Sequence, residues 1–344
     1  MLQRDQKIAI YMEGALEEGF GKMGYGVLRF SPNPVVCVVD SANAGKDAAD
    51  ITGIPRPVPV VASVEKARDL GADVLVLGIA PPGGLIPQEW YATLDRAVEL
   101  GLCLVNGLHD MLAPRYLDLA EGQWVWDIRK EPEGIGVGYA EARHLGNKRV
   151  LFVGTDMSVG KMTAGLAVWK AALDRGVKAE FIATGQVGIV ITGRGVALDC
   201  VRLDFAAGAI EREVMAVSRS ELVLVEGQGS LVHPGSSANL ALIRGTVPTH
   251  LVLCHRAGMD VCPRLPWLKI PPLSDLIRLN EDLAEACGTF QRPKTVAVCL
   301  NTAGLDDAEA AEAVTQTEAE TGLPTTDPVR HGPEKILQAL GYGG

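Results

Sequence analysis

The chain has 344 residues, which is too long for one small domain, and its 47% of hydrophobic residues suffice to bury sizeable cores. A net charge of −10 argues against a general affinity for nucleic acid or anionic membranes, although a local basic pocket could hold an anion. No apolar run approaches the ~18–20 residues of a membrane span, and no signal segment is expected. The seven cysteines are scattered without a C-x-x-C pair, so we expect reduced thiols in a cytoplasmic protein.

The first half alternates apolar runs with stretches of helical periodicity, as parallel sheets covered on both faces require. Predicted strands are Ile8–Met12, Val35–Val39, Val58–Val61, Val74–Leu77 and Leu102–Val105, and predicted helices are Ser63–Leu70 and Trp90–Leu100. This pattern predicts an α/β fold with a Rossmann-like N-terminal domain.

A glycine-rich stretch, Gly19–Gly24, reads G-x-G-x-x-G, and Asp40 ends the following strand. The stretch does not follow its strand directly, and no convincing helix comes after Gly24, as a dinucleotide site would require. We therefore predict a glycine-rich surface turn. The loops at residues 40–46 and 80–84 also end strands, so they are expected at the ligand-binding edge of the sheet.

The polar stretch Arg129–Gly134 breaks the alternation and predicts a division into domains 1–140 and 141–344. Predicted strands of the second half are Val150–Val153, Glu180–Thr184, Leu222–Val225, Leu251–Cys254 and Val296–Leu300, with helices at Met162–Arg175, Ala206–Val217 and Asp306–Thr321. This half is predicted to be a doubly wound, P-loop-like domain.

The stretch GTDMSVGKMT, which follows the first strand of that half, is predicted to hold phosphate groups on backbone N–H groups, a helix N-terminus and a lysine. Five residues separate its two glycines, one more than in the standard pattern, and a methionine stands where a hydroxyl residue should follow the lysine. The hydroxyl that would bind magnesium is displaced by roughly 100° around the helix. The predicted cofactor-binding residues here are Gly154, Thr155, Ser158, Val159, Gly160, Lys161, Met162 and Thr163.

The loop resembles that of dethiobiotin synthetase and its amidoligase relatives. The stretch Val225–Ser230 resembles the segment of the same group in which a glutamate follows a strand. The resemblance implies that Glu226 binds magnesium if the ligand is a magnesium nucleotide, with Asp204 as a second acid and Asn301 at an adenine edge. Asp204 is equally well explained as a helix N-cap, and Asn301 as a turn residue.

Further polar residues are predicted near the site. Cationic side chains suit substrate carboxylates, although each is more often a solvated surface charge. The predicted substrate-binding residues are Gln186, Arg194, Gln228, Arg244 and Arg256. His233 and His255 are candidates for proton transfer, or are merely hydrogen-bonded. The spacing of His, Cys and carboxylates gives no zinc signature.

Five stretches together resemble the DgcN-type D-glutamate N-acetyltransferase family: VVCVVDSANAGKDAADI, GTDMSVGKMT, ATGQVGI, VEGQGSLVHPGSSANLALIRG and LCHRAG. The resemblance implies a Rossmann-like domain, a P-loop domain and acetyl transfer from acetyl-CoA to the amino group of D-glutamate or a similar amino acid. That reaction requires a general base, for which Glu226 is the first candidate, followed by Asp156 and His233.

Two alternatives remain open. One is a ligase or kinase of the dethiobiotin-synthetase type that uses ATP with magnesium. The other is a nucleotide or CoA sensor without catalysis. In every case we expect a small-molecule ligand, no nucleic acid or membrane partner, and a homo-oligomer.

Overall fold

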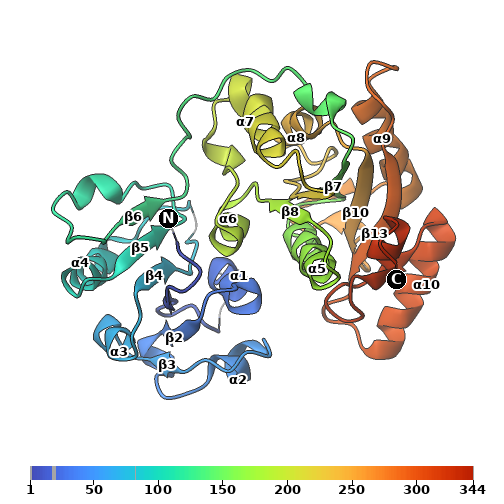
Figure 1. Cartoon of the computed structure of the whole chain (residues 1–344). Helices are drawn as coiled ribbons and strands as arrows, with labels where there is room; N and C mark the ends of the chain where they lie inside the picture. Colours follow the sequence, from blue (N-terminus) through green and yellow to red (C-terminus); the bar gives the residue numbers. More distant parts are fainter. Residues whose placement is uncertain (1, 18–20, 82, 344) are drawn as a thin grey trace. The chain divides into compact units, whose positions relative to one another are not determined.

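The computed structural model describes residues 2–17, 21–81 and 83–343 (Figure 1). The chain forms two compact units: unit 1 is Met1–Glu131 with Gln186–Cys200, and unit 2 is Pro132–Gly185 with Val201–Gly344. This division differs from 1–140 and 141–344, because a segment from the second half rejoins unit 1. The segment contains α6 (Gln186–Thr192), whose apolar residues are buried and which packs on α1 (Lys22–Phe30).

Unit 1 is built on one parallel sheet with strand order β3-β2-β1-β4-β5-β6. Its strands are β1 (Ile8–Tyr11), β2 (Val35–Val39), β3 (Val60–Val61), β4 (Val74–Leu77), β5 (Cys103–Asn106) and β6 (Val125–Asp127). Its further α-helices are α2 (Ala48–Thr52), α3 (Val64–Asp69) and α4 (Tyr91–Glu99). The order is that of a Rossmann fold, which confirms the predicted fold class of this half.

Helix α1 corrects the prediction made for the glycine-rich stretch. Gly19 and Phe20 lie outside the described residues, but Gly21 and Gly24 are buried, and the helix begins between them at Lys22. The Gly24 amide donates to the Gly78 carbonyl at 2.8 Å, so the helix lies close against the end of β4. The prediction was wrong because glycines lower helix propensity, whereas tertiary packing overrides propensity.

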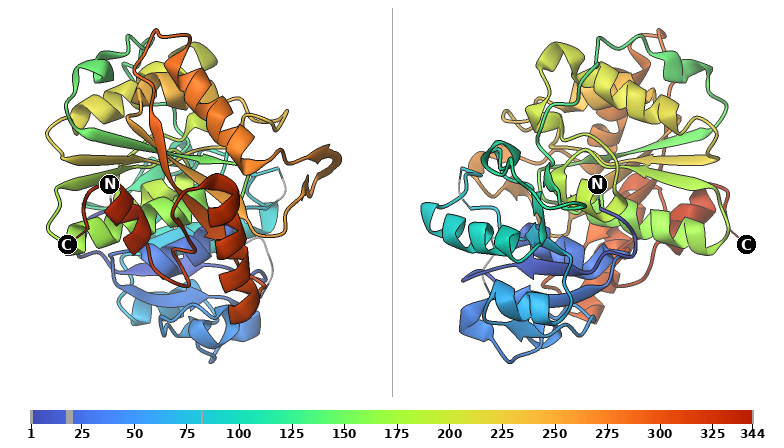
Figure 2. Two further views of the ribbon diagram at one scale, coloured as in Figure 1. Left: turned by 90° about the vertical axis from the view of Figure 1, so that its right-hand side faces the viewer. Right: turned by 60° about the vertical axis from the view of Figure 1, so that its left-hand side comes forward.

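Unit 2 is built on a second parallel sheet with strand order β14-β13-β10-β7-β9-β8. Its strands are β7 (Lys148–Gly154), β8 (Ala179–Ile182), β9 (Leu222–Val225), β10 (His250–Arg256), β13 (Lys294–Asn301) and β14 (Thr325–Thr326). Its α-helices are α5 (Lys161–Asp174), α7 (Leu203–Ala216), α8 (Asn239–Thr246), α9 (Leu273–Glu285), α10 (Asp307–Thr321) and α11 (Glu334–Ala339). Helices α5 and α11 pack together on one face of the sheet, and α7 and α8 pack together on the other (Figure 2).

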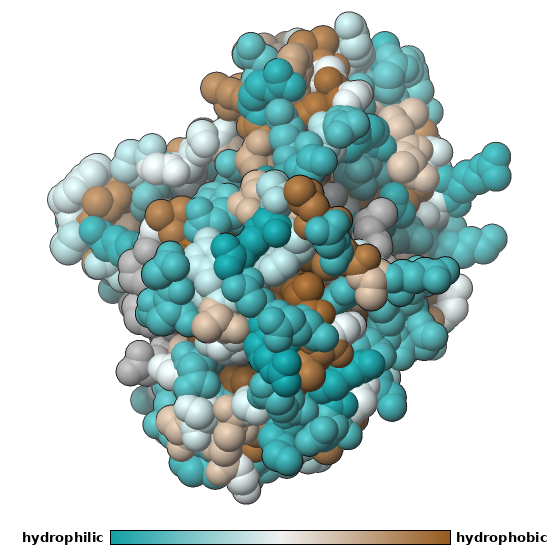
Figure 3. All heavy atoms as spheres, turned by 90° about the vertical axis from the view of Figure 1, so that its left-hand side faces the viewer, coloured by the Kyte–Doolittle hydropathy of each residue, from teal (hydrophilic) through white to brown (hydrophobic). Residues whose placement is uncertain are grey.

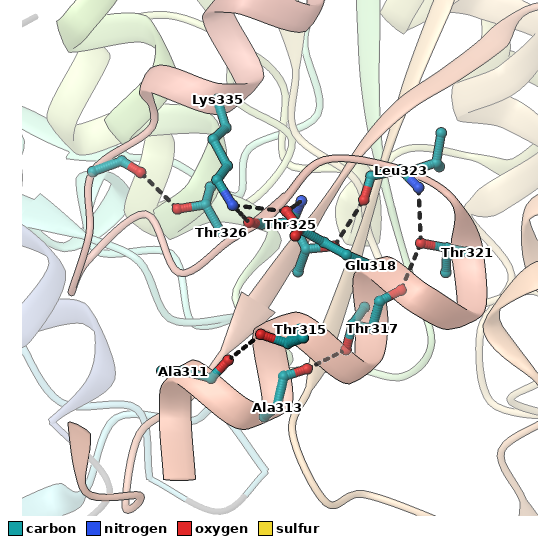
Figure 4. A network of polar contacts seen from close by, with 11 residues as sticks. Ala311, Ala313, Thr315, Thr317, Glu318, Thr321, Leu323, Thr325, Thr326 and Lys335 are labelled. Atoms are coloured by element: carbon teal, nitrogen blue, oxygen red, sulfur yellow. Dashed lines mark hydrogen bonds and ion pairs between the residues drawn. The ribbon is translucent and has the colours of Figure 1, made fainter. Parts of the chain in front are cut away.

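Two smaller features complete unit 2. A two-stranded antiparallel hairpin, β11 (Val261–Cys262) and β12 (Leu265–Lys269), follows β10. The short edge strand β14 is held by side chains of α10 and α11 (Figure 4). There Glu318 accepts from the Thr325 amide at 2.9 Å and from Lys335 at 2.7 Å. The ion pair holds the pKa of Glu318 below its usual value.

Hydrophilic side chains predominate on the face drawn in Figure 3, and the apolar ones lie in small groups between them. Within the described ranges of the chain, none of the helices combines the length and the apolar character needed to cross a membrane.

Candidate functional site

The loop between β7 and α5 has the backbone conformation of an anion cradle. Ser158 and Gly160 adopt positive φ angles of 58° and 111°, and Gly160 is the residue before the helix. Alternation of right- and left-handed residues turns successive N–H groups toward one spot, and the positive end of α5 reinforces it. Lys161 opens this helix, one residue before the predicted Met162, and Met162 and Thr163 lie half-buried in its first turn.

Lys161 is buried and its side chain folds back over the start of the loop. Its Nζ donates to the Asp156 carbonyl oxygen at 2.7 Å. A Cβ on Gly154 would lie 2.7 Å from that Nζ, and one on Gly227 would lie 3.1 Å from Lys161 Cδ and overlap the Phe152 carbonyl oxygen. Glycine at both strand ends therefore makes room for the lysine.

Glu226 is the first residue after β9 and is buried, with 5% of its surface exposed. Its Oε2 accepts from the amides of Thr184 at 2.9 Å and Gly185 at 3.3 Å. Thr184 Oγ1 donates to the Glu226 carbonyl, and Gln228 Nε2 donates to Thr184 Oγ1 at 3.0 Å. Because β8 and β9 are neighbours, the two predicted polar segments that follow them meet at one sheet edge.

Thr155 is fully buried and a 2.9 Å hydrogen bond joins its Oγ1 to His255 Nδ1. Burial lowers the pKa of His255 to about 4, so this ring is neutral near pH 7. His255 also borders a cavity of about 460 Å³, whose wall includes Asp260, Leu300 and Glu320. Thr155 thus links the loop to this cavity.

Asn301, at the end of β13, lies beside the loop. A Cβ on Gly160 would be 4.0 Å from Asn301 Nδ2, while Asn301 Oδ1 accepts from the Ala303 amide at 3.0 Å. Arg256 is opposite Asn301 in the strand register and is exposed. The predicted residue Asn301 and the loop therefore share one edge of the sheet.

Other predicted residues have surroundings that the sequence did not indicate. Arg244 donates to the carbonyls of Leu283 and Ala284 at the end of α9 and lies 5.0 Å from the Phe290 ring. Burial lowers the pKa of this guanidinium. These contacts tie Arg244 to the end of α9, and its contact with substrate stays a prediction.

Asp204 lies exposed in the first turn of α7, which begins at Leu203, so it is not the N-cap. An acid there favours the helix N-terminus. Gln186 and Arg194, predicted to bind substrate, belong to unit 1, where Gln186 is the first residue of α6.

Asp156, His233 and Cys262 come together although the sequence spacing gave no metal signature. Each offers a ligand atom, and these atoms lie within 4.8 Å of one another. Cys262 was not predicted as a site residue. No sequence signal could have grouped it with the other two, because the three residues lie on separate loops and strands.

The fold and the site together define a P-loop protein with an additional Rossmann-like unit. Residues 136–337 match a domain of unknown function described as the DUF1611_C P-loop domain, and residues 41–131 match the DUF1611_N Rossmann-like domain. The chain belongs to the DUF1611 family, which confirms the predicted resemblance.

Relatives and a solved structure agree with this assignment. The chain is 39% identical over 283 residues to a D-glutamate N-acetyltransferase of Tritonibacter scottomollicae, covering 81% of this chain and 84% of that protein. It is 35% identical, with the same coverage, to a D-glutamate N-acetyltransferase of a Pseudoalteromonas species. A crystal structure of a DUF1611 family protein from Anabaena variabilis is 48% identical and matches with a TM-score of 0.93, covering 98% of this chain and 99% of that one.

Proposed function

We propose that this protein is an N-acetyltransferase that transfers the acetyl group of acetyl-CoA to the amino group of D-glutamate or a similar amino acid. The observation that carries the proposal is the name of the two relatives, D-glutamate N-acetyltransferase, at 39% and 35% identity over 81% of the chain. The proposal includes a cytoplasmic, homo-oligomeric enzyme without nucleic-acid or membrane partners.

The phosphate loop would hold the anionic part of the cofactor. Acetyl-CoA carries a pyrophosphate and a 3′-phosphate, and the loop amides with Lys161 suit either group. Acetyl transfer cleaves no phosphate, so it needs no magnesium-binding hydroxyl directly after the lysine. This agrees with Met162 at that position.

Glu226 would be the general base. An amino acid is protonated at its amine near neutral pH and must lose that proton before it attacks the thioester carbonyl. The Glu226 carboxylate is held in place by the amides of Thr184 and Gly185. The tetrahedral intermediate then collapses, the C–S bond breaks, and CoA leaves as a thiolate that takes up a proton. The loop amides and the second N–H of Gln228 Nε2 are candidate donors to the oxyanion.

The buried acid beside a phosphate loop also favours a second candidate, an enzyme that uses ATP with magnesium. Here Lys161 would contact the phosphates and Glu226 the metal ion. The two candidates differ in the product they release, which is free CoA thiol in one case and ADP or phosphate in the other.

The deciding experiment incubates the full chain with acetyl-CoA and a panel of D- and L-amino acids, without added magnesium or ATP, while free thiol is measured. We expect thiol release that requires an acceptor and is fastest with D-glutamate, with L-glutamate as the stereochemical control. Absence of thiol release with every acceptor, together with magnesium-dependent ATP turnover, would overturn the proposal in favour of the second candidate. Tight CoA binding without any turnover would instead indicate a sensor.

A further inference from the structure

Three chemically different side chains converge beside the phosphate loop. Asp156 lies in the loop after β7, His233 in the loop after β9, and Cys262 in β11. Their exposed fractions are only 4%, 8% and 1%, and their ligand atoms lie within 4.8 Å of one another. Buried polar groups of this kind are normally paired or bound to a metal.

Hydrogen bonding leaves this cluster incompletely satisfied. Asp156 Oδ1 accepts from the Met157 amide at 2.6 Å, and His233 Nδ1 accepts from the Gly235 amide at 3.0 Å. In the part of the chain that the structure describes, no hydrogen bond joins Asp156, His233 and Cys262 to one another. A proton relay to a nucleophilic thiol would require such bonds at about 2.6–3.2 Å.

We propose that Asp156, His233 and Cys262 bind one transition-metal ion of the zinc type. Metal–ligand distances of about 2.0–2.3 Å place the ligand atoms of a tetrahedral site roughly 3.3–3.8 Å apart, which small side-chain movements achieve here. Thiolate, imidazole and carboxylate together suit zinc better than magnesium or calcium. Three protein ligands leave the fourth position to a water or substrate atom, as in catalytic zinc sites.

Ion binding would act directly on the phosphate loop. The carbonyl oxygen of Asp156 accepts from Lys161 Nζ at 2.7 Å, so fixing the Asp156 carboxylate also fixes the partner of the lysine. The ion either replaces the Gly235 amide at His233 Nδ1, or binds Nε2 while the ring proton moves to Nδ1, so the Gly235 hydrogen bond is lost in both cases. Binding also displaces the thiol proton of Cys262. As metal ligands, Asp156 and His233 could not serve as general bases, which leaves Glu226.

This inference does not depend on acetyl transfer, and its test needs no substrate. The full chain is treated with 1,10-phenanthroline, dialysed and titrated with Zn²⁺ and Co²⁺. We expect one ion per chain, a thiolate-to-cobalt absorption band in the near ultraviolet, and a higher melting temperature with Zn²⁺. The Cys262→Ser and His233→Asn variants should bind at least about 100-fold more weakly, since even the loss of indirect support for a ligand costs 10–100-fold. The exposed Cys287 provides the matched control, Cys287→Ser, which should bind normally.

Melting of the metal-free variants separates a lost ligand from a failed fold, because Cys262→Ser should melt like the metal-free parent. Sub-stoichiometric binding by the parent chain, or an unchanged cobalt band in Cys262→Ser, would overturn the proposal. So would transfer of an acetyl group from acetyl-CoA to Cys262 in the metal-free protein, detected by mass spectrometry, because that result assigns the thiol to covalent catalysis.

Discussion

Both units place a glycine-rich loop between the first strand of their sheet and the following helix, but the residue near the strand end differs. In unit 2, β7 ends in Gly154, and the side chain of Lys161 occupies the space above it. In unit 1 the residue after β1 is Met12, which is fully buried and fills the space beside Gly21 and Gly24. One loop is thus arranged around a cation and the other around an apolar side chain.

The acids that follow β9 and β2 also differ in their hydrogen-bond partners. Glu226, after β9, accepts from the backbone amides of Thr184 and Gly185. Asp40, after β2, accepts from Asn43 Nδ2 at 2.9 Å and from the amides of Gly14 and Ala42, both at 3.3 Å. These bonds occupy the carboxylate within unit 1, where a dinucleotide-binding acid would face a ribose. A glycine-rich loop followed by a strand-end acid therefore does not define a cofactor site, because the side chains that fill the loop decide its role.

The largest expected effect tests whether the two strand-end glutamates differ in function. Glu226→Gln keeps an oxygen for the Thr184 amide but removes the base, so we expect kcat for acetyl transfer to fall roughly 1000-fold with little change in melting temperature. The control is Glu13, which follows Met12 after β1 and accepts from the Ser41 amide at 2.9 Å. The Glu13→Gln variant should leave kcat unchanged. Equal losses in both variants would break the contrast between the units.

A second test compares close backbone contacts. An alanine Cβ at position 227 would overlap the Phe152 carbonyl, which cannot move away, so we expect Gly227→Ala to lower the free energy of unfolding by about 3 kcal/mol. Gly24→Ala should cost only about 1 kcal/mol, because the flexible Met12 side chain can shift. Gly146→Ala, which meets no atom within 4 Å, serves as the neutral control in urea unfolding.

A third test uses the lysines that open α5 and α1. Lys161→Met should weaken acetyl-CoA binding about 100-fold, since it removes the positive charge that the stretch Gly154–Lys161 offers to a phosphate group. Lys22→Met should bind acetyl-CoA normally by calorimetry, because Lys22 is exposed at the start of α1, after a loop arranged around Met12. Retained affinity in Lys161→Met would count against the cofactor site placed here.

A smaller effect is expected at Asp40. The Asp40→Asn substitution places an amide N–H₂ among N–H donors, so we expect a loss of about 1–2 kcal/mol in the free energy of unfolding. The kcat of the folded enzyme should not change. A variant that unfolds normally but binds acetyl-CoA poorly would show that Asp40 has a ligand-binding role instead.

The smallest expected effect is on stability. It tests whether a surface ion pair contributes equally little in each unit. Hydrogen bonds from Arg96 lower the pKa of Glu65 in unit 1 to about 2, and Lys335 lowers that of Glu318 in unit 2. A carboxylate with a lowered folded-state pKa stabilises the protein above its unfolded pKa, near 4.5, and this stabilisation is lost as pH falls through the folded value. Arg96→Met and Lys335→Met should each reduce stability at pH 7 only slightly, because solvent screens exposed ion pairs, and the difference from the parent should vanish in acid. A much larger loss in one unit would mean that its pair is not a simple surface interaction.

Much of the fold was predictable because apolar periodicity reports burial directly. All ten predicted strands agree with observed ones to within two residues at each end. β6 was missed because its three residues, Val125–Asp127, are too few to form a pattern. α1 was missed because two glycines interrupt it, and it is stabilised by packing on α6, β1 and β4.

The sequence by itself determined the two α/β units, the family and the phosphate loop, since these depend on local periodicity and on residues adjacent in the chain. Only the tertiary structure decided that residues 186–200 join unit 1, that Arg244 binds the end of α9, and that Asp156, His233 and Cys262 meet. The physical reason is that such contacts join segments far apart in the chain. Their formation depends on which strands are neighbours in the sheet and on the direction in which each loop leaves it, and neither is encoded in a local pattern.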